Sequence, residues 1–122
     1  MNKLLLGRSV LVVEDEMLVV MMIEDMLSDL GCEAITTAAT VDQALQHIEN
    51  GVFDVAMLDM NLGGQSSETV ADALASRSVP FIYSTGNSSG DMKLGHRDRP
   101  VLRKPFKFKA LEELLATAMP AV

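Results

Sequence analysis

The segment VLVVEDE (residues 10–16) places four consecutive apolar residues directly before three consecutive acids. An apolar run this short and uniform is typical of a strand that is buried on both faces, and it is too short for an amphipathic helix. Adjacent carboxylates repel one another, and their burial without partners is unfavourable or raises their pKa values. A core strand that ends at Glu14, Asp15 and Glu16 therefore needs a feature nearby that offsets the negative charge.

The rest of the chain alternates short apolar runs with segments of helical periodicity. The predicted strands cover residues 10–13, 33–37, 53–58, 80–84 and 101–103. The predicted helices cover residues 17–30, 40–50, 67–76 and 108–119, with a further short and weakly supported helix within 85–99. Thr40 and Gln43 form a capping box at the start of the second helix. This order predicts an α/β fold, (βα)5, in which a doubly wound five-stranded parallel sheet is covered on both faces by helices.

Composition limits the class of protein further. A chain of 122 residues is expected to form one domain, residues 1–122, and its net charge of −7 argues against nucleic acid as a partner. No apolar run approaches the ~20 residues that span a membrane, the N-terminus shows no cleavage site, and Cys32 has no second cysteine to pair with. We therefore expect a soluble, cytoplasmic protein. The basic segment 93–109 is either a solvated edge or a surface that faces an acidic site or partner.

Polar residues follow four of the five predicted strands. They are Glu14-Asp15-Glu16, Asp59, Ser84-Thr85 and Lys104. Because the carboxyl ends of parallel strands meet at one edge of the sheet, where ligands of such folds bind, we expect these side chains to converge. Oxygen ligands from two strand ends suit Mg²⁺, which would relieve the repulsion among Glu14, Asp15 and Asp59 and could bridge to a phosphoryl group. Lys104 and Thr85 would supply further hydrogen-bond donors to that group.

Four motifs at these strand ends resemble the receiver domain of two-component response regulators. They are LVVEDE (11–16), DVAMLDMNL (54–62), PFIYSTGN (80–87) and VLRKPF (101–106). The resemblance implies a flavodoxin-like receiver fold in which Asp59 is the phosphoacceptor, Thr85 the switch hydroxyl and Lys104 the phosphate-binding lysine. It also implies that Glu14, Asp15, Asp59 and the carbonyl of Asn61 form the Mg²⁺ site, where Glu14 acts directly or through water.

The resemblance has further consequences for function. It implies a partner that carries phosphohistidine, either a histidine kinase or a histidine phosphotransfer protein, and a domain that catalyses only its own phosphorylation and dephosphorylation. Because the chain ends one helix after Lys104, we expect a stand-alone receiver that signals by protein contact or phosphorelay. Two alternatives stay open: a scaffold that is never phosphorylated, and an aspartyl-nucleophile phosphohydrolase. Such hydrolases typically carry a second acid two residues after the nucleophile, where this chain has Asn61.

Several local features resemble or depart from the family pattern. The run Tyr83-Ser84-Thr85-Gly86 is similar to a subgroup with Phe-X-Thr-Gly after the fourth strand, and Val101 stands where many receivers carry an aromatic switch residue. Gly63 replaces a frequent proline, so we expect a more mobile loop there. We also predict a cis Lys104–Pro105 bond, a partner-docking surface on helix 17–30 that includes Met21 or Met22, and signal output through ordering of residues 85–109.

Other polar residues have simpler interpretations. We expect Glu16 in the first helical turn, Asp54 as a surface acid at the far end of its strand, and Ser66 and Ser67 as helix caps. His47 and His96 lack ligand partners at metal-binding spacing, so neither is expected to hold a metal.

Overall fold

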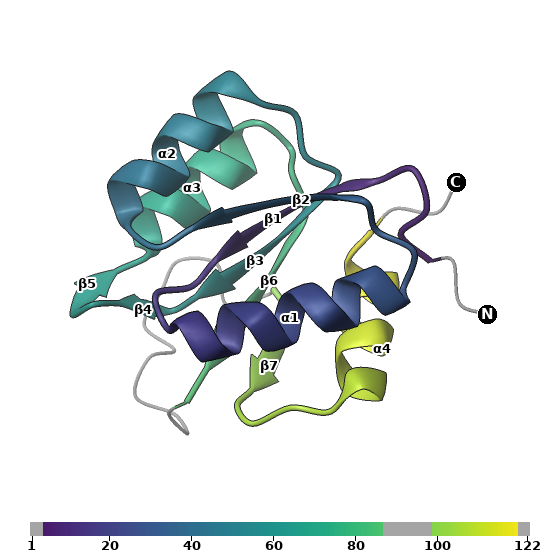
Figure 1. The fold of residues 1–122 in the computed structure, drawn as a ribbon. Coiled ribbons are helices and arrows are strands. Elements are labelled where there is room, and N and C mark those ends of the chain that lie inside the picture. Colours follow the sequence, from purple (N-terminus) through teal and green to yellow (C-terminus); the bar gives the residue numbers. More distant parts are fainter. Residues whose placement is uncertain (1–3, 87–98, 120–122) are drawn as a thin grey trace.

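The computed structural model describes residues 4–86 and 99–119, which form one five-stranded parallel sheet with helices on both faces (Figure 1). The sheet consists of β1 (Ser9–Val13), β2 (Ala34–Ala38), β3 (Val55–Asp59), β6 (Phe81–Thr85) and β7 (Val101–Arg103). The described helices are α1 (Met17–Asp29), α2 (Val41–Asn50), α3 (Glu68–Ser76) and α4 (Phe108–Ala118). The predicted doubly wound α/β fold is confirmed. The further helix predicted within 85–99 falls largely on residues 87–98, which lie outside the described residues.

The apolar run of β1 packs on both faces of the sheet, as its sequence predicts. Val10 and Val12 lie in a buried cluster with residues of α1 and α4, whereas Leu11 and Val13 lie in a second cluster with residues of α2 and α3. Figure 1 shows the corresponding layers, with α1 and α4 on one side of the sheet and α2 and α3 on the other. A strand covered in this way cannot alternate apolar and polar residues, because both of its faces lie in a core.

The strand order is β2-β1-β3-β6-β7, so the chain changes direction across the sheet after β2. The first connection leads from β1 outward to β2, and the second leads back past β1 to β3. The neighbouring strands β1 and β3 therefore flank the switch in strand order, and a crevice opens beyond their carboxyl ends. Glu14 follows β1 directly and Asp59 ends β3, which places both acids at this position.

Local sequence signals explain several element boundaries. The N–H of Gln43 donates to Thr40 Oγ1 at 3.1 Å, and Gln43 Oε1 accepts the N–H of Ala39 at 2.9 Å, so both side chains of the predicted capping box make cap hydrogen bonds at the start of α2. Asp54 Oδ2 accepts the N–H of Ser9 at 2.7 Å, which places Asp54 before β3 and at the opposite end from Asp59. Asp54 is exposed there, as predicted.

The loop after β3 forms a small antiparallel hairpin that the sequence analysis did not predict. Its strands are β4 (Asn61–Leu62) and β5 (Gln65–Ser66), joined by Gly63 and Gly64. The φ angles of the two glycines are +57° and +89°, which are the positive values that a two-residue type I′ turn requires at both central positions. The loop that we expect to be more mobile at Gly63 thus contains a tight turn between two short strands.

No helix among the described residues is long and apolar enough to cross a membrane.

Candidate functional site

An open cleft of about 310 Å³ lies beyond the carboxyl edge of the sheet. Its lining comes from the segments that follow β1, β3, β6 and β7, and includes Asp15, Asp59, Asn61, Gly86 and Lys104. Four separate strand ends thus contribute to one cavity, as the topology predicts. Thr85 is the last residue of β6 and only 6 % exposed, and its neighbour Ser84 pairs with Asp59 in the sheet register.

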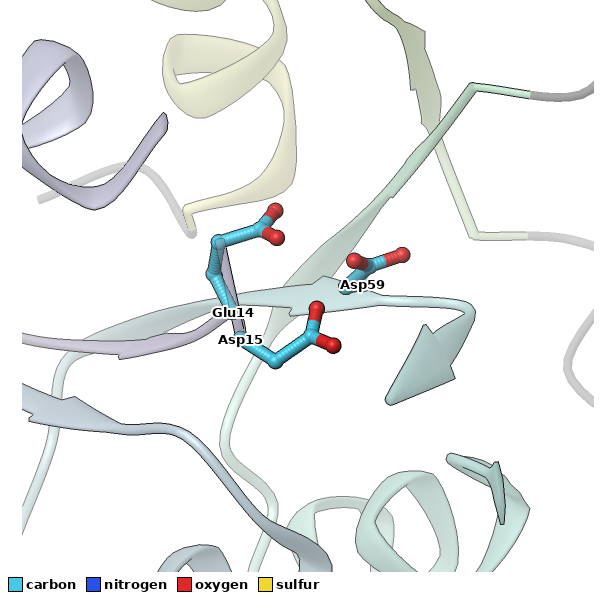
Figure 2. A group of neighbouring side chains, drawn as sticks. All are labelled: Glu14, Asp15 and Asp59. Atoms are coloured by element: carbon cyan, nitrogen blue, oxygen red, sulfur yellow. The ribbon is translucent and has the colours of Figure 1, made fainter. Parts of the chain in front are cut away.

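The carboxylates of Glu14, Asp15 and Asp59 gather at this edge (Figure 2). Each can offer one oxygen such that all three oxygens lie within 4.8 Å of one another. Their exposure differs, because Glu14 is 1 % and Asp59 6 % exposed while Asp15 is exposed to solvent. Three hard oxygen donors at this spacing suit a divalent cation, and the residues present therefore fit the Mg²⁺ site that the sequence predicts.

Lys104 lies among these carboxylates. Its Nζ forms an ion pair with Glu14 Oε1 at 2.6 Å and donates to Asp59 Oδ2 at 3.1 Å. The backbone N–H of Lys104 donates to the carbonyl of Thr85 at 2.8 Å, which continues the β6–β7 pairing beyond the end of β7. The Lys104–Pro105 bond is cis, which confirms the prediction. An ammonium group therefore offsets part of the acidic charge that VLVVEDE places at the end of β1.

The electrostatics of Glu14 and Lys104 reflect their burial. Desolvation raises the pKa of Glu14 from 4.5 to about 7, even though the contact with Lys104 and the N–H of Glu16 lower it. Burial alone would lower the pKa of the Lys104 ammonium, but its contacts with Glu14 and Asp59 outweigh burial and raise that pKa above 10.5. The ammonium of Lys104 is therefore stabilised by two buried carboxylates, whereas burial disfavours the charged form of Glu14.

Each of the three clustered carboxylates also accepts a hydrogen bond from a backbone N–H group. The N–H of Asn61 donates to Asp59 Oδ1 at 3.2 Å, and the N–H of Glu16 donates to Glu14 Oε2 at 3.1 Å. The N–H of Gly63 donates to Asp15 Oδ2 at 3.0 Å. This last contact was not predicted from the sequence, although a Gly-Gly pair is a recognised hairpin signal.

The structure confirms some of the predicted roles of the remaining polar residues and differs from others. Glu16 occupies the N-cap position of α1 and not its first turn, and its side chain makes no cap hydrogen bond. Ser66 Oγ accepts the N–H of Glu68 at 3.2 Å at the start of α3, as a capping residue would. Ser67 occupies the predicted N-cap position of α3, but its buried hydroxyl donates to the carbonyl of Met60 at 3.1 Å and makes no cap hydrogen bond. His47 is half-buried on α2, away from the acidic cluster, and His96 lies outside the described residues.

A parallel five-stranded sheet with clustered acids and a lysine at its carboxyl edge defines the receiver class of signalling domain. Comparison with known families agrees, because residues 10–116 match the response regulator receiver domain family. This chain therefore belongs to the response regulator receiver domain family.

Solved structures of similar chains share the fold. SdrG from Sphingomonas melonis Fr1 is 43 % identical, with a TM-score of 0.80, over 97 % of this chain and 98 % of that chain. A structure of SdrG in its BeF3-activated conformation is 44 % identical, with a TM-score of 0.77, over 95 % of this chain and 97 % of that one. The receiver domain of the sensor histidine kinase PA1611 from Pseudomonas aeruginosa PAO1 is 28 % identical, with a TM-score of 0.82, over 92 % of this chain and 97 % of that one. The PA1611 structure contains a magnesium ion coordinated in its active site cleft.

A curated relative is longer than this chain. The transcriptional regulatory protein YvrH of Bacillus subtilis (strain 168) is 31 % identical over 87 residues, which are 70 % of this chain and 37 % of YvrH. The chain thus spans little more than a third of that relative.

Proposed function

We propose that this receiver domain accepts a phosphoryl group on Asp59 from a phosphohistidine of a histidine kinase or histidine phosphotransfer protein, in a reaction that depends on Mg²⁺. The observation that carries this proposal is the position of Asp59, whose carboxylate lies in the cleft between the Lys104 ammonium and the N–H of Asn61. An acid in this position is oriented at both oxygens and lines the open cleft.

The acidic cluster supports a magnesium site. Glu14, Asp15 and Asp59 would hold the ion together with the carbonyl of Asn61, and Glu14 would act directly or through water. When bound, Mg²⁺ supplies charge neutralisation and polarises the oxygens of the transferred phosphoryl group. The magnesium ion in the cleft of the PA1611 receiver domain supports the same assignment for this chain.

The residues of the chain suit an in-line phosphoryl transfer. A carboxylate oxygen of Asp59 forms the new O–P bond while the N–P bond of phosphohistidine breaks, and the leaving imidazole takes up a proton. Lys104 stabilises negative charge on the transferred group, and the hydroxyl of Thr85 donates to one of its oxygens. Water later attacks phosphorus, releases inorganic phosphate and restores the Asp59 carboxylate.

The amino-terminal half of α1 is suited to receive the partner. Met17, Leu18 and Met21 are 70 %, 81 % and 54 % exposed, and α1 begins three residues after Glu14 at the site. Of the two methionines predicted as docking residues, Met21 is exposed and Met22 is half-buried. An exposed apolar strip beside Asp59 fits the helical bundle that carries phosphohistidine. The receiver domain would pass its signal on by protein contact or phosphorelay.

Labelling with acetyl phosphate tests the proposal. Wild-type protein with Mg²⁺ should gain the mass of one phosphoryl group, whereas Asp59→Ala, or wild-type protein in EDTA, should not. Asp54→Ala is a matched control, because it removes an acid at the other end of β3 and should still be labelled. Labelling of Asp59→Ala would refute the assignment of the acceptor, and absence of labelling in the wild type would favour an unphosphorylated scaffold. Steady turnover of small phosphate esters would favour a phosphohydrolase.

A further inference from the structure

The β4–β5 hairpin contacts two of the acids at the site. The N–H of Asn61, the first residue of β4, donates to Asp59 Oδ1, and the N–H of Gly63, in the turn, donates to Asp15 Oδ2. The carbonyl of Asn61, which the proposed function assigns to the metal, belongs to the same strand. One short segment therefore contacts both Asp59, the proposed phosphoacceptor, and Asp15, the exposed acid of the cluster.

The base of the hairpin is anchored in the core. Leu62 is 3 % exposed and packs in the cluster that covers the α2 and α3 face of the sheet. Ser67 follows β5 and is fully buried, and both its hydroxyl and its N–H donate to the carbonyl of Met60, at 3.1 and 3.3 Å. These contacts hold the two ends of the hairpin together, so its turn has a defined position relative to β1.

The turn directs a donor at Asp15. The N–H of Gly64 donates to Asn61 Oδ1 at 2.9 Å, which closes the turn on its own strand and leaves the N–H of Gly63 aimed at Asp15. An exposed carboxylate otherwise samples several rotamers, but this hydrogen bond occupies one side of Oδ2 and leaves Oδ1 available. Hydrogen bonds to ligating carboxylates are known to orient them and to strengthen metal binding.

We propose that Gly63 is a positioning residue of the metal site, whose N–H holds Asp15 in the orientation that a divalent cation requires. This inference rests on the proposed function, because it takes Asp15 as a metal ligand. Closure of the hairpin and binding of the cation then favour one another, and the coupling is equal in both directions. Mg²⁺ should accordingly slow amide exchange at Gly63 and Gly64.

Two glycines offer a matched pair of variants. Gly64 (φ +89°) and Gly7 (φ +76°) both require a left-handed backbone, and a Cβ at either position would meet no atom within 4 Å. Alanine therefore introduces similar backbone strain at both positions. Only Gly64 lies in the hairpin, whereas Gly7 precedes the amino end of β1, at the opposite edge of the sheet.

Calorimetric titration of Mg²⁺ into the unphosphorylated chain measures the effect. We expect Gly64→Ala to weaken Mg²⁺ binding by roughly threefold to tenfold, as loss of one hydrogen bond to a ligating carboxylate would. Gly7→Ala should lower the thermal midpoint while the dissociation constant stays at the wild-type value. Equal affinity in Gly64→Ala and the wild type would overturn the inference and leave the proposed function intact. Absence of Mg²⁺ binding by the wild type would overturn the metal site itself.

A second measurement does not depend on Mg²⁺ or on how well Gly64→Ala folds. In metal-free protein, Asp15→Ala should speed amide hydrogen exchange at Gly63 severalfold, because its acceptor is removed, while the N–H of Gly64 keeps its acceptor on Asn61. Unchanged exchange at Gly63 would show that its N–H does not donate to Asp15 in solution and would overturn the inference.

Discussion

The raised pKa of Glu14 predicts that the metal-free protein loses stability as the pH rises, and that Glu14→Gln removes this loss. The pKa of Glu14 is about 7 in the folded protein against an ordinary value of 4.5. The stabilising contribution of the protonated form is therefore fully present below pH 4.5 and is lost as the pH rises through 7. At about 1.4 kcal/mol per unit of pKa, the full difference corresponds to about 3 kcal/mol of unfolding free energy.

Urea denaturation in EDTA, followed by circular dichroism, measures this effect at pH 5 and pH 8. The unfolding free energy of Glu14→Gln should exceed that of the wild type by less than about 1 kcal/mol at pH 5 and by up to about 3 kcal/mol at pH 8. Glu16→Gln is the matched control, because Glu16 is exposed and lies 4.0 Å from Lys104, and it should show no such change with pH. If the difference between Glu14→Gln and the wild type were the same at both pH values, the desolvation argument would be wrong.

Three further predictions address docking, packing and output. Met21→Ser should slow phosphotransfer from a phosphohistidine partner while labelling by acetyl phosphate stays intact, and Val52→Ser, at a residue that is 89 % exposed, should leave both reactions unchanged. Leu111→Ala should lower the unfolding free energy by about 2–5 kcal/mol in urea denaturation, because Leu111 is fully buried between α4 and the sheet. Phosphorylation or a beryllofluoride mimic should slow hydrogen exchange across residues 86–99, most of which lie outside the described residues. If exchange slowed only in other parts of the chain, this account of output would be wrong.

The features that could be predicted from sequence are those with a strong local signal or a repeated pattern. VLVV indicates a strand with two buried faces because its four residues are uniformly apolar, and the structure confirms both faces. The cap hydrogen bonds of Thr40 and Gln43 could be predicted because the two residues lie within one helical turn of each other. Convergence of Asp15, Asp59 and Lys104 follows from topology alone, since parallel strands share one carboxyl edge.

The features that could not be predicted depend on contacts between distant parts of the chain. Two-residue strands such as β4 and β5 are too short for periodicity to show, so the sequence does not predict the hairpin that Gly63 and Gly64 close. The sequence predicts that Ser67 caps a helix, but its hydroxyl donates to the buried carbonyl of Met60. The direct ion pair between Glu14 and Lys104 depends on side-chain conformation and reach, about which the sequence pattern carries no information.

The charge balance of the site links its folding to its proposed chemistry. The ammonium of Lys104 contacts two buried carboxylates, those of Glu14 and Asp59, and desolvation raises the pKa of Glu14. A phosphoryl group on Asp59 would bring about two negative charges to the same position. Lys104 would then contact the phosphoryl oxygens as well as Glu14. Binding of a divalent cation would therefore be more favourable after phosphoryl transfer to Asp59 than before it. The hairpin and Lys104 contact different oxygens of Asp59, because the N–H of Asn61 donates to Oδ1 and the ammonium of Lys104 donates to Oδ2, so the hairpin can support a cation at Asp15 while Lys104 keeps its contact with Asp59.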